Sequence, residues 1–302
     1  MLRDLGHRSF ILEPLAPARP CDLLIALHAR RSAAAVVASR AAFPERPIAV
    51  ALTGTDLYRD IHDDESAQRS LELADRLIVL HGGAAAELPR HLRRKVVVVP
   101  QSAPPVLRKP RPDARSFEVA VVGHLRAEKD PLRTALAARL LPASSRLRVT
   151  HAGGALSQDF ALSARAEEQV NARYRWLGEI PRPAARGLIA RARLLALTSA
   201  MEGGANVVSE ALAAGTPVIA TRIPAMVAIL GRTYPGLFPL GNTAALARLL
   251  VRAETDASFL DRLRRECRAH SSALSPAREK SALKSLVAAL RPGRSGPSRS
   301  LT

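Results

Sequence analysis

The sequence predicts an α/β fold with two doubly wound, Rossmann-like domains, and three observations lead to that class. The chain has 302 residues, which is enough for two domains with separate cores. Short apolar runs alternate with segments of helical periodicity, the pattern of parallel sheets with crossover helices. A stretch with four prolines and three basic residues, QSAPPVLRKPRPD (residues 101–113), interrupts the alternation and is typical of a linker.

These features divide the chain into five parts. Residues 1–103 are predicted to form the first domain, residues 104–115 the linker and residues 116–275 the second domain. Residues 276–290 follow a Ser-Pro start signal and carry the last predicted helix. Residues 291–302 lack apolar periodicity, and we expect them to be disordered.

The start of the first domain differs from the usual start of a doubly wound domain. Residues 1–12 read as the tail of a helix that Gly6 closes, followed by a strand. A doubly wound domain normally begins with a strand and a glycine turn ahead of its first helix, and neither is present, so we expect its first strand to be missing. Further strands are expected at residues 22–26, 47–53, 76–80 and 96–99, with helices at residues 32–42, 66–74 and 84–88.

The second domain repeats the alternation. Strands are expected at residues 117–122, 147–150, 174–177 and 194–197 and again after Pro217, with helices at residues 131–140, 205–214, 243–250 and 257–269.

The net charge and the aromatic content of the chain indicate which kinds of molecule it binds. The net charge is +18, but 40 of the 45 basic residues are Arg spread through every segment, and only 3% of residues are aromatic. Because base stacking needs aromatic side chains, we expect no nucleic-acid partner and assign the charge to attraction of anionic substrates. No apolar run is long enough to span a membrane and no secretion signal begins the chain, so we expect a cytoplasmic protein without a transmembrane segment. Cys21 and Cys267 show no metal-ligand spacing.

The stretch LLALTSAMEGGANVVSEALAAGTPVIAT (residues 194–221) carries the strongest functional pattern. It reads as strand, tight loop, helix and strand. Gly203 and Gly204 allow backbone to approach a ligand closely, and the helix that starts near Ala205 offers free N–H groups and the positive end of its dipole. This loop is therefore predicted to bind phosphate.

Two carboxylates bracket the loop and the helix. Glu210 lies roughly 8 Å along the helix axis from its start, so it meets a different part of a ligand from Glu202. An ionised carboxylate accepts hydrogen bonds from paired sugar hydroxyls. The alternative is that Glu202 is a helix N-terminal charge and Glu210 a solvated surface residue.

The segment EGGANVVSEALAAGTPVIAT resembles the signature of family 4 type glycosyltransferases with the GT-B fold. The resemblance implies a UDP-sugar donor, with Glu202, Gly203 and Gly204 at the donor sugar and diphosphate and Glu210 on the ribose. Ala205 and Asn206 at the helix start join this donor site. GT-B enzymes generally need no divalent metal, so we expect no cofactor and no metal, and they commonly return their last helix to the first domain.

A second donor segment is GHLRAEKDP, after the strand at residues 117–122. Relatives place an Arg directly after Gly123 and a Lys five positions further on, both on the diphosphate. Lys129 matches, whereas His124 replaces the Arg, with Arg126 as a compensating cation. We nominate Lys129 and Glu202 as catalytic residues; the alternative for Lys129 is a solvated surface side chain.

The segment HAGGAL follows the next predicted strand. Gly153 and Gly154 allow backbone to come near the donor, although a plain turn explains them equally well. His151 is more often a satisfied structural histidine in such a place than a catalytic one.

The acceptor site is predicted at a strand end of the first domain. Thr53, Gly54, Thr55 and Asp56 follow the strand at residues 47–53, where open parallel sheets bind ligands, although a capped strand-to-helix turn is the alternative. LTGTDLYRDI and SLELADRLIVL also resemble the selenosugar synthases of selenoneine biosynthesis, which implies selenophosphate as the acceptor. That anion needs a basic pocket in the cleft between the domains. Arg59 would supply the charge, with Asp56 holding Arg59 or a sugar hydroxyl.

Two other functions stay open. One is a GT-B glycosyltransferase with a hydroxyl acceptor in lipid or polysaccharide synthesis. The other is a non-enzymatic basic binding protein, whose binding to phosphate backbones would fall steeply with salt. The sequence predicts neither the sugar nor the oligomeric state.

Overall fold

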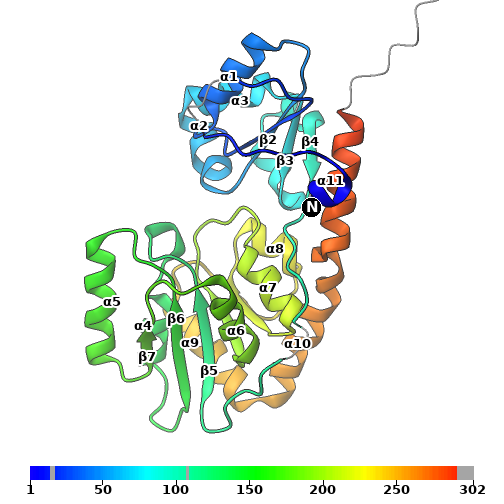
Figure 1. Ribbon diagram of the computed structural model, residues 1–302. Helices are drawn as coiled ribbons and strands as arrows, with labels where there is room; N and C mark the ends of the chain where they lie inside the picture. Colours follow the sequence, from blue (N-terminus) through cyan, green and yellow to red (C-terminus); the bar gives the residue numbers. More distant parts are fainter. Residues whose placement is uncertain (14–17, 107–108, 291–302) are drawn as a thin grey trace, which may run out of the picture. The chain divides into compact units, whose positions relative to one another are not determined.

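The computed structural model describes residues 1–13, 18–106 and 109–290. The chain divides into two compact units, one made of Met1–Val99 together with the residues from Glu279 onward, and the other of Pro100–Arg278. Each unit has its own parallel sheet with helices packed on it (Figure 1). The predicted disordered tail, residues 291–302, and two linker positions, 107 and 108, lie outside the described residues.

The first unit contains a four-stranded parallel sheet in the order β1-β2-β3-β4. Its strands are β1 (Leu24–Leu27), β2 (Ile48–Ala51), β3 (Arg76–Val79) and β4 (Val96–Val98). Its helices are α1 (Ala33–Ala42), α2 (Ile61–Asp63) and α3 (Glu65–Leu73), with the π-helix η2 (Asp56–Asp60) and the 3-10 helices η1 (Arg3–Leu5), η3 (Gly82–Glu87) and η4 (Arg90–Lys95).

Both faces of this sheet are covered. Successive side chains of a strand point to opposite faces, and all four residues of β2 are apolar, so each face needs a core. Ile48 and Val50 point into a core shared with α1 and α3. Ala49 and Ala51 point to the other face, where Leu286 and Leu290 pack against them. Leu286 belongs to the last helix, α11 (Pro276–Ala289), so the end of the described chain belongs to the first unit (Figure 1).

The opening of the chain differs from the prediction at one point. Gly6 ends η1 in the left-handed region, at φ 83°, as expected for a helix-closing glycine. The strand predicted after Gly6 is wrong, because residues 7–13 form no regular structure. Ile11 is 96% exposed, so this apolar run has no neighbouring strand or core to pack against.

The second unit contains a six-stranded parallel sheet in the order β10-β9-β8-β5-β6-β7. Its strands are β5 (Phe117–Val122), β6 (Leu147–Ala152), β7 (Tyr174–Trp176), β8 (Leu194–Leu197), β9 (Val218–Thr221) and β10 (Leu237–Phe238). Its helices are α4 (Arg133–Arg139), α5 (Gln158–Val170), α6 (Arg182–Arg191), α7 (Asn206–Ala214), α8 (Pro224–Leu230), α9 (Thr243–Thr255) and α10 (Ala257–Ser271), with the 3-10 helices η5 (Ala127–Lys129) and η6 (Ser272–Leu274).

The strand order of this sheet reverses between β5 and β8. The chain runs outward from β5 through β6 to β7, then returns to the other side of β5 and runs outward through β8, β9 and β10. In open parallel sheets, ligands bind outside the carboxyl ends of the strands at such a switch point. The loops that follow β5 and β8 therefore define the expected position of a ligand.

Candidate functional site

The loops after β5 and β8 are joined by hydrogen bonds at the switch point. Thr198, directly after β8, donates from Oγ1 to the carbonyl oxygens of Lys129 (3.0 Å) and Asp130 (2.9 Å). The amide of Ala200 donates to the carbonyl of Glu128 at 2.8 Å. These hydrogen bonds hold together two segments that are about 70 positions apart in sequence, so that their side chains form one surface.

Lys129 and Glu202 meet on that surface. Lys129 Nζ lies 2.5 Å from Glu202 Oε1, and Ser199 Oγ donates to the same oxygen at 2.6 Å. The Glu202 side chain is 8% exposed and that of Lys129 20% exposed. Lys129 is therefore not the solvated surface side chain that the alternative interpretation allowed.

The glycine loop leads directly into α7. Ala205, at the N-cap position, adopts the left-handed region at φ 44°, and no side chain caps this helix. The amides of Val208 and Ser209 donate to the carbonyl of Ala205, so those of Asn206 and Val207 are left for another acceptor, and the dipole places partial positive charge beside Gly203 and Gly204. The predicted helix started at about Ala205, one residue from the observed start.

Glu210 is held on the buried side of α7. Arg182, at the start of α6, donates to Glu210 Oε1 from Nη2 (3.1 Å) and Nε (3.2 Å), and Asn206 Nδ2 lies 3.4 Å from the same oxygen. The Glu210 side chain is 7% exposed, which excludes the solvated surface residue considered as the alternative.

The two glutamates share a further property. In the part of the chain that the structure describes, every hydrogen bond to Glu202 or Glu210 ends on Oε1. Neither Oε2 is among the buried polar atoms that lack a partner, so each one reaches solvent. Both carboxylates are thus fixed by one oxygen and keep the other to accept hydrogen bonds from a ligand.

The loops after β5 and β6 also touch. The amide of Leu125 donates to the carbonyl of Gly154 at 2.9 Å. A Cβ on Gly153 would lie 1.9 Å from the carbonyl oxygen of Gly123, so this glycine is required by contact between two backbones. His124 is exposed beside them, and Arg126 has a buried Nε without a hydrogen-bond partner among the described residues.

His151 is a buried histidine with both ring nitrogens hydrogen-bonded, as expected for a structural role. It is 1% exposed, with Nε2 3.2 Å from the carbonyl of Gly123 and Nδ1 3.0 Å from the hydroxyl of Tyr174. Since a carbonyl only accepts, Nε2 carries the proton and Nδ1 accepts from Tyr174. Burial lowers the pKa of His151 to about 4, so the ring is neutral at physiological pH.

In the first unit, Asp56 organises the predicted acceptor loop. Asp56 is fully buried; its Oδ1 accepts from the amides of Thr53 (2.8 Å) and Gly54 (2.9 Å), and its Oδ2 accepts from the amide of Ala29 (2.9 Å). It therefore joins the loop after β2 to the loop after β1. Arg59 Nε donates to Asp60 Oδ1 at 3.1 Å.

Sequence reasoning missed two residues at this edge. His28 directly follows β1, in the left-handed region at φ 73°, with Nε2 3.1 Å from Thr55 Oγ1 and 3.7 Å from Asp60 Oδ2. Asp60 is 3% exposed, and its Oδ2 has no hydrogen-bond partner among the described residues. The strand-end rule that nominated Thr53 would have found His28 had it also been applied to the strand at residues 22–26.

Within the described ranges, no group of three or more His, Cys, Asp or Glu side chains is placed to hold a metal ion. In the same ranges, none of the helices combines the length and apolar character needed to cross a bilayer.

Comparison with known proteins gives a family and a fold. Residues 106–270, more than half of the chain, match the family model described as glycosyl transferases group 1. No significant match was found among the curated proteins.

Three solved structures share the fold at low sequence identity. Anabaena Alr3699/HepE in complex with UDP-glucose has a TM-score of 0.74 at 18% identity, with 88% of this chain and 79% of that chain covered. Sucrose-phosphate synthase from Thermosynechococcus elongatus has a TM-score of 0.68 at 20% identity, covering 89% and 73%. The α,α-trehalose-phosphate synthase (UDP-forming) from Burkholderia vietnamiensis has a TM-score of 0.72 at 14% identity, covering 92% and 72%. The two Rossmann-like units therefore form a GT-B architecture, as predicted.

Proposed function

The chain belongs to the group 1 glycosyl transferases, and from this premise we propose that it transfers a sugar from a UDP-sugar bound at the switch point of the second sheet. One observation carries the proposal: Glu202, directly before the glycine loop, and Glu210, in the middle of α7, are both buried, and each keeps Oε2 for a ligand. A UDP-sugar presents hydroxyls at both of its ends, on the sugar and on the ribose, with the diphosphate between them.

The groups between the two glutamates suit a diphosphate. Lys129 supplies an ammonium group that its ion pair with Glu202 holds in place, and the uncapped start of α7 supplies N–H groups. Arg126, with its unpartnered Nε, is a third donor. The structural relatives solved with UDP or UDP-glucose, and one described as UDP-forming, support the same donor class.

The reaction requires stabilisation of a leaving group. When the bond between the anomeric carbon and the diphosphate breaks, positive charge grows on the sugar and negative charge on the diphosphate. Lys129 and the α7 N–H groups are fixed before the reaction, so they stabilise that negative charge without reorganising. Glu202 positions Lys129 through its Oε1 and faces the sugar with its Oε2.

For the acceptor we propose selenophosphate. Its selenium attacks the anomeric carbon as UDP leaves, and water then cleaves the Se–P bond, which releases phosphate and gives a 1-seleno sugar of selenoneine biosynthesis. The resemblance of LTGTDLYRDI to selenosugar synthases of the family 4 type supports this acceptor. Arg30 and Arg59 lie at the same edge of the first sheet, each with a half-exposed side chain, and pair with one carboxylate, Asp60, at 3.6 and 3.1 Å. Two guanidinium groups beside one carboxylate suit a small anion.

A second candidate, transfer to a hydroxyl acceptor, is favoured by one observation. His28 lies between Thr55 and Asp60 at the carboxyl edge of the first sheet, and a histidine beside a carboxylate is a common general base. Burial lowers the pKa of His28, so the imidazole is neutral at physiological pH.

Mass spectrometry of the products distinguishes the two acceptors. The protein is incubated with UDP-glucose or UDP-N-acetylglucosamine, each with selenophosphate or with a panel of sugar and glycerol hydroxyl acceptors, and the Lys129→Ala variant serves as the inactive control. A 1-seleno sugar formed only with selenophosphate supports the proposal. A glycoside formed with a hydroxyl acceptor, and no selenium product, would replace it with the second candidate.

A further inference from the structure

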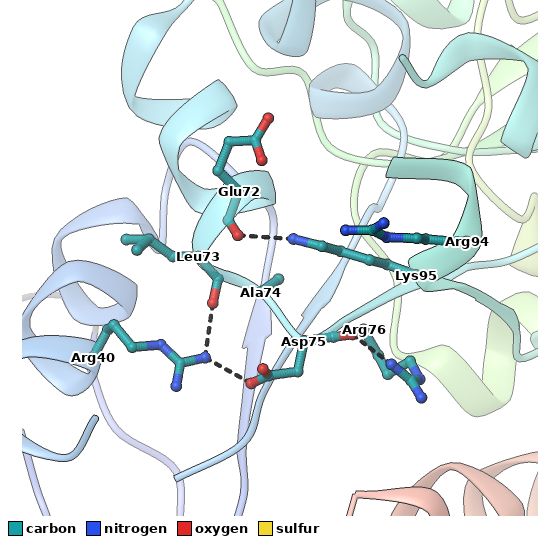
Figure 2. Close-up of a pocket in the computed structure, with 8 residues that line it drawn as sticks. All are labelled: Arg40, Glu72, Leu73, Ala74, Asp75, Arg76, Arg94 and Lys95. Atoms are coloured by element: carbon teal, nitrogen blue, oxygen red, sulfur yellow. Dashed lines mark hydrogen bonds and ion pairs between the residues drawn. The ribbon is translucent and has the colours of Figure 1, made fainter. Parts of the chain in front are cut away.

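A polar pocket opens within the first unit, lined by residues that precede and follow Thr53–Asp56 in the sequence. Figure 2 shows its lining, and its volume is about 540 Å³. Asp75 directly precedes β3, Lys95 directly precedes β4, and Arg40 lies in the last turn of α1. Because all four strands are parallel, their amino ends share one edge of the sheet and their carboxyl ends the opposite edge. The pocket is therefore separate from the predicted acceptor loop.

Both carboxylates of this pocket already have partners. Asp75 Oδ2 accepts from Arg40 Nη2 at 2.6 Å and from the amide of Ile48 at 2.8 Å. Glu72 Oε1 lies 2.7 Å from His91 Nε2. Asp75 is therefore paired with Arg40, and one carboxylate, Glu72, faces the three other cations of the lining, Arg76, Arg94 and Lys95.

Three cations remain without such a partner. Arg76 Nη1 donates to the carbonyl of Asp75 at 2.9 Å, and Lys95 Nζ donates to the carbonyl of Glu72 at 2.8 Å. Arg94 is exposed and lies alongside Lys95 (Figure 2). Among the described residues, no carboxylate lies within 4.0 Å of the charged groups of these three side chains. The carbonyls satisfy hydrogen bonds but do not neutralise charge.

Burial makes the charged form of Lys95 less stable than it would be in water. Burial lowers the pKa of its ammonium, and the repulsion from Arg94 and Arg40 acts in the same direction, whereas Glu72 and Asp75 oppose it. A bound anion would favour the charged form of Lys95 and reduce the repulsion between neighbouring cations.

We propose that this pocket binds a small phosphorylated anion through Arg76, Arg94 and Lys95, at a site independent of sugar transfer. Guanidinium groups match pairs of phosphate oxygens and the ammonium adds a point charge, so three cations beside one remaining carboxylate, Glu72, favour a ligand with two or more negative charges. The volume is that of a small-molecule site, and no aromatic side chain lines it for base stacking, which favours a phosphorylated metabolite over a nucleic acid.

Calorimetric titration of inorganic pyrophosphate into the full chain, with UDP present at saturation, tests the proposal. We expect binding to the unmodified protein that Arg94→Ala weakens by about tenfold, and Arg76→Ala with Arg94→Ala by about a hundredfold. Arg69→Ala is the matched control, because Arg69 is an exposed arginine of α3 in the same unit that does not line the pocket. The control should bind pyrophosphate like the unmodified protein.

Three outcomes would overturn the proposal. Pyrophosphate that binds Arg94→Ala as tightly as the unmodified protein excludes the pocket, as does failure of both pyrophosphate and vesicles with phosphatidic acid to bind. Binding that is lost in Lys129→Ala but kept in Arg94→Ala assigns the anion to the donor site. If pyrophosphate fails but the protein sediments with phosphatidylcholine vesicles only when they contain phosphatidic acid, and Arg94→Ala abolishes this, the ligand is a lipid headgroup rather than a free metabolite. Because Arg94 is exposed, its replacement leaves the fold intact, which circular dichroism checks.

Discussion

Glu202 and Glu210 in the second unit and Asp56 in the first are all buried carboxylates at the carboxyl edges of parallel sheets, yet their oxygens are used differently. Each glutamate is held by one oxygen and keeps the other in contact with solvent. Asp56 accepts backbone N–H groups with both oxygens and is fully buried. A carboxylate at a ligand-binding edge therefore binds ligand only if its hydrogen-bonding capacity is not already used by the loop itself. The following predictions test this difference, from the largest expected effect to the smallest.

Lys129→Ala should lower kcat by roughly 10² to 10³-fold, because it removes a preorganised charge from the leaving diphosphate. Affinity for free UDP-sugar should fall less than kcat, since the diphosphate gains charge as the bond breaks. Steady-state kinetics at saturating donor measure the effect. Lys109→Ala removes another lysine of the same unit and is the control; equal turnover in both variants would show that Lys129 lies outside the site.

Asp56→Ala should destabilise the first unit by about 3 kcal/mol or more, because it leaves three backbone N–H groups without their acceptor. Hydrogen exchange of peptides that cover residues 48–61 measures the local stability. Asp22→Ala is the control, since the Asp22 side chain is 99% exposed. Unchanged exchange with impaired acceptor use would instead make Asp56 a ligand-binding residue.

The second unit should lose stability below neutral pH because of His151. Its pKa is about 4 when folded and about 6.5 when unfolded, so the unfolded state binds more protons between these values and stability falls as pH drops from about 6.5 to 4, by about 3 kcal/mol. Trp176 is the sole tryptophan and pairs with His151 across β6 and β7, so its fluorescence reports unfolding there. His151→Gln should be less stable at pH 7 but lack this part of the slope; an unchanged slope contradicts the assignment.

Glu210→Gln should weaken UDP binding by about 1 to 3 kcal/mol, because a charged acceptor for ribose hydroxyls becomes neutral. Calorimetry with UDP measures the loss, and the unfolding curve should move little, in contrast to Asp56→Ala. Glu254→Gln is the matched control, because Glu254 accepts from Ser145 and the amide of Arg146 away from the switch point. Equal UDP affinity in both variants would remove Glu210 from the donor site.

The sequence predicted the arrangement around Gly203 better than that around Asp56, and the reason is local. The loop at Gly203 and the helix after it are specified by neighbouring residues, so spacing alone placed Glu202 and Glu210 correctly relative to α7. Lys129 meets Glu202 because β5 and β8 are neighbours in the sheet. The spacing of residues in the sequence does not reveal that strand order. Ser199 and Arg182, which fix the two glutamates, were missed for the same reason.

In the loop around Asp56, the hydrogen bonds of the carboxylate depend on contacts with another loop, which the sequence alone does not reveal. Asp56 stood in the nominated segment, but its partner, the Ala29 amide, lies 27 positions away. Only the folded arrangement shows that the carboxylate is occupied. The strand predicted after Gly6 failed because apolar residues form a strand only where a sheet edge and a core are available to them.

The smallest expected effect concerns His28 and separates the two proposed acceptors. The amide of Arg31 donates to His28 Nδ1 at 3.4 Å, so the proton of the neutral ring is on Nε2, which donates to Thr55 Oγ1. In that tautomer no ring nitrogen is free to take a proton from a hydroxyl. Selenophosphate is already a strong nucleophile and needs no base. We therefore expect His28→Gln, which retains a donor near Thr55, to change kcat with selenophosphate by less than about threefold, whereas loss of a general base lowers rates by roughly 10² to 10⁴-fold. A decrease of that size, with UDP affinity unchanged, would show that the ring takes up the other tautomer during catalysis and that the acceptor is a hydroxyl.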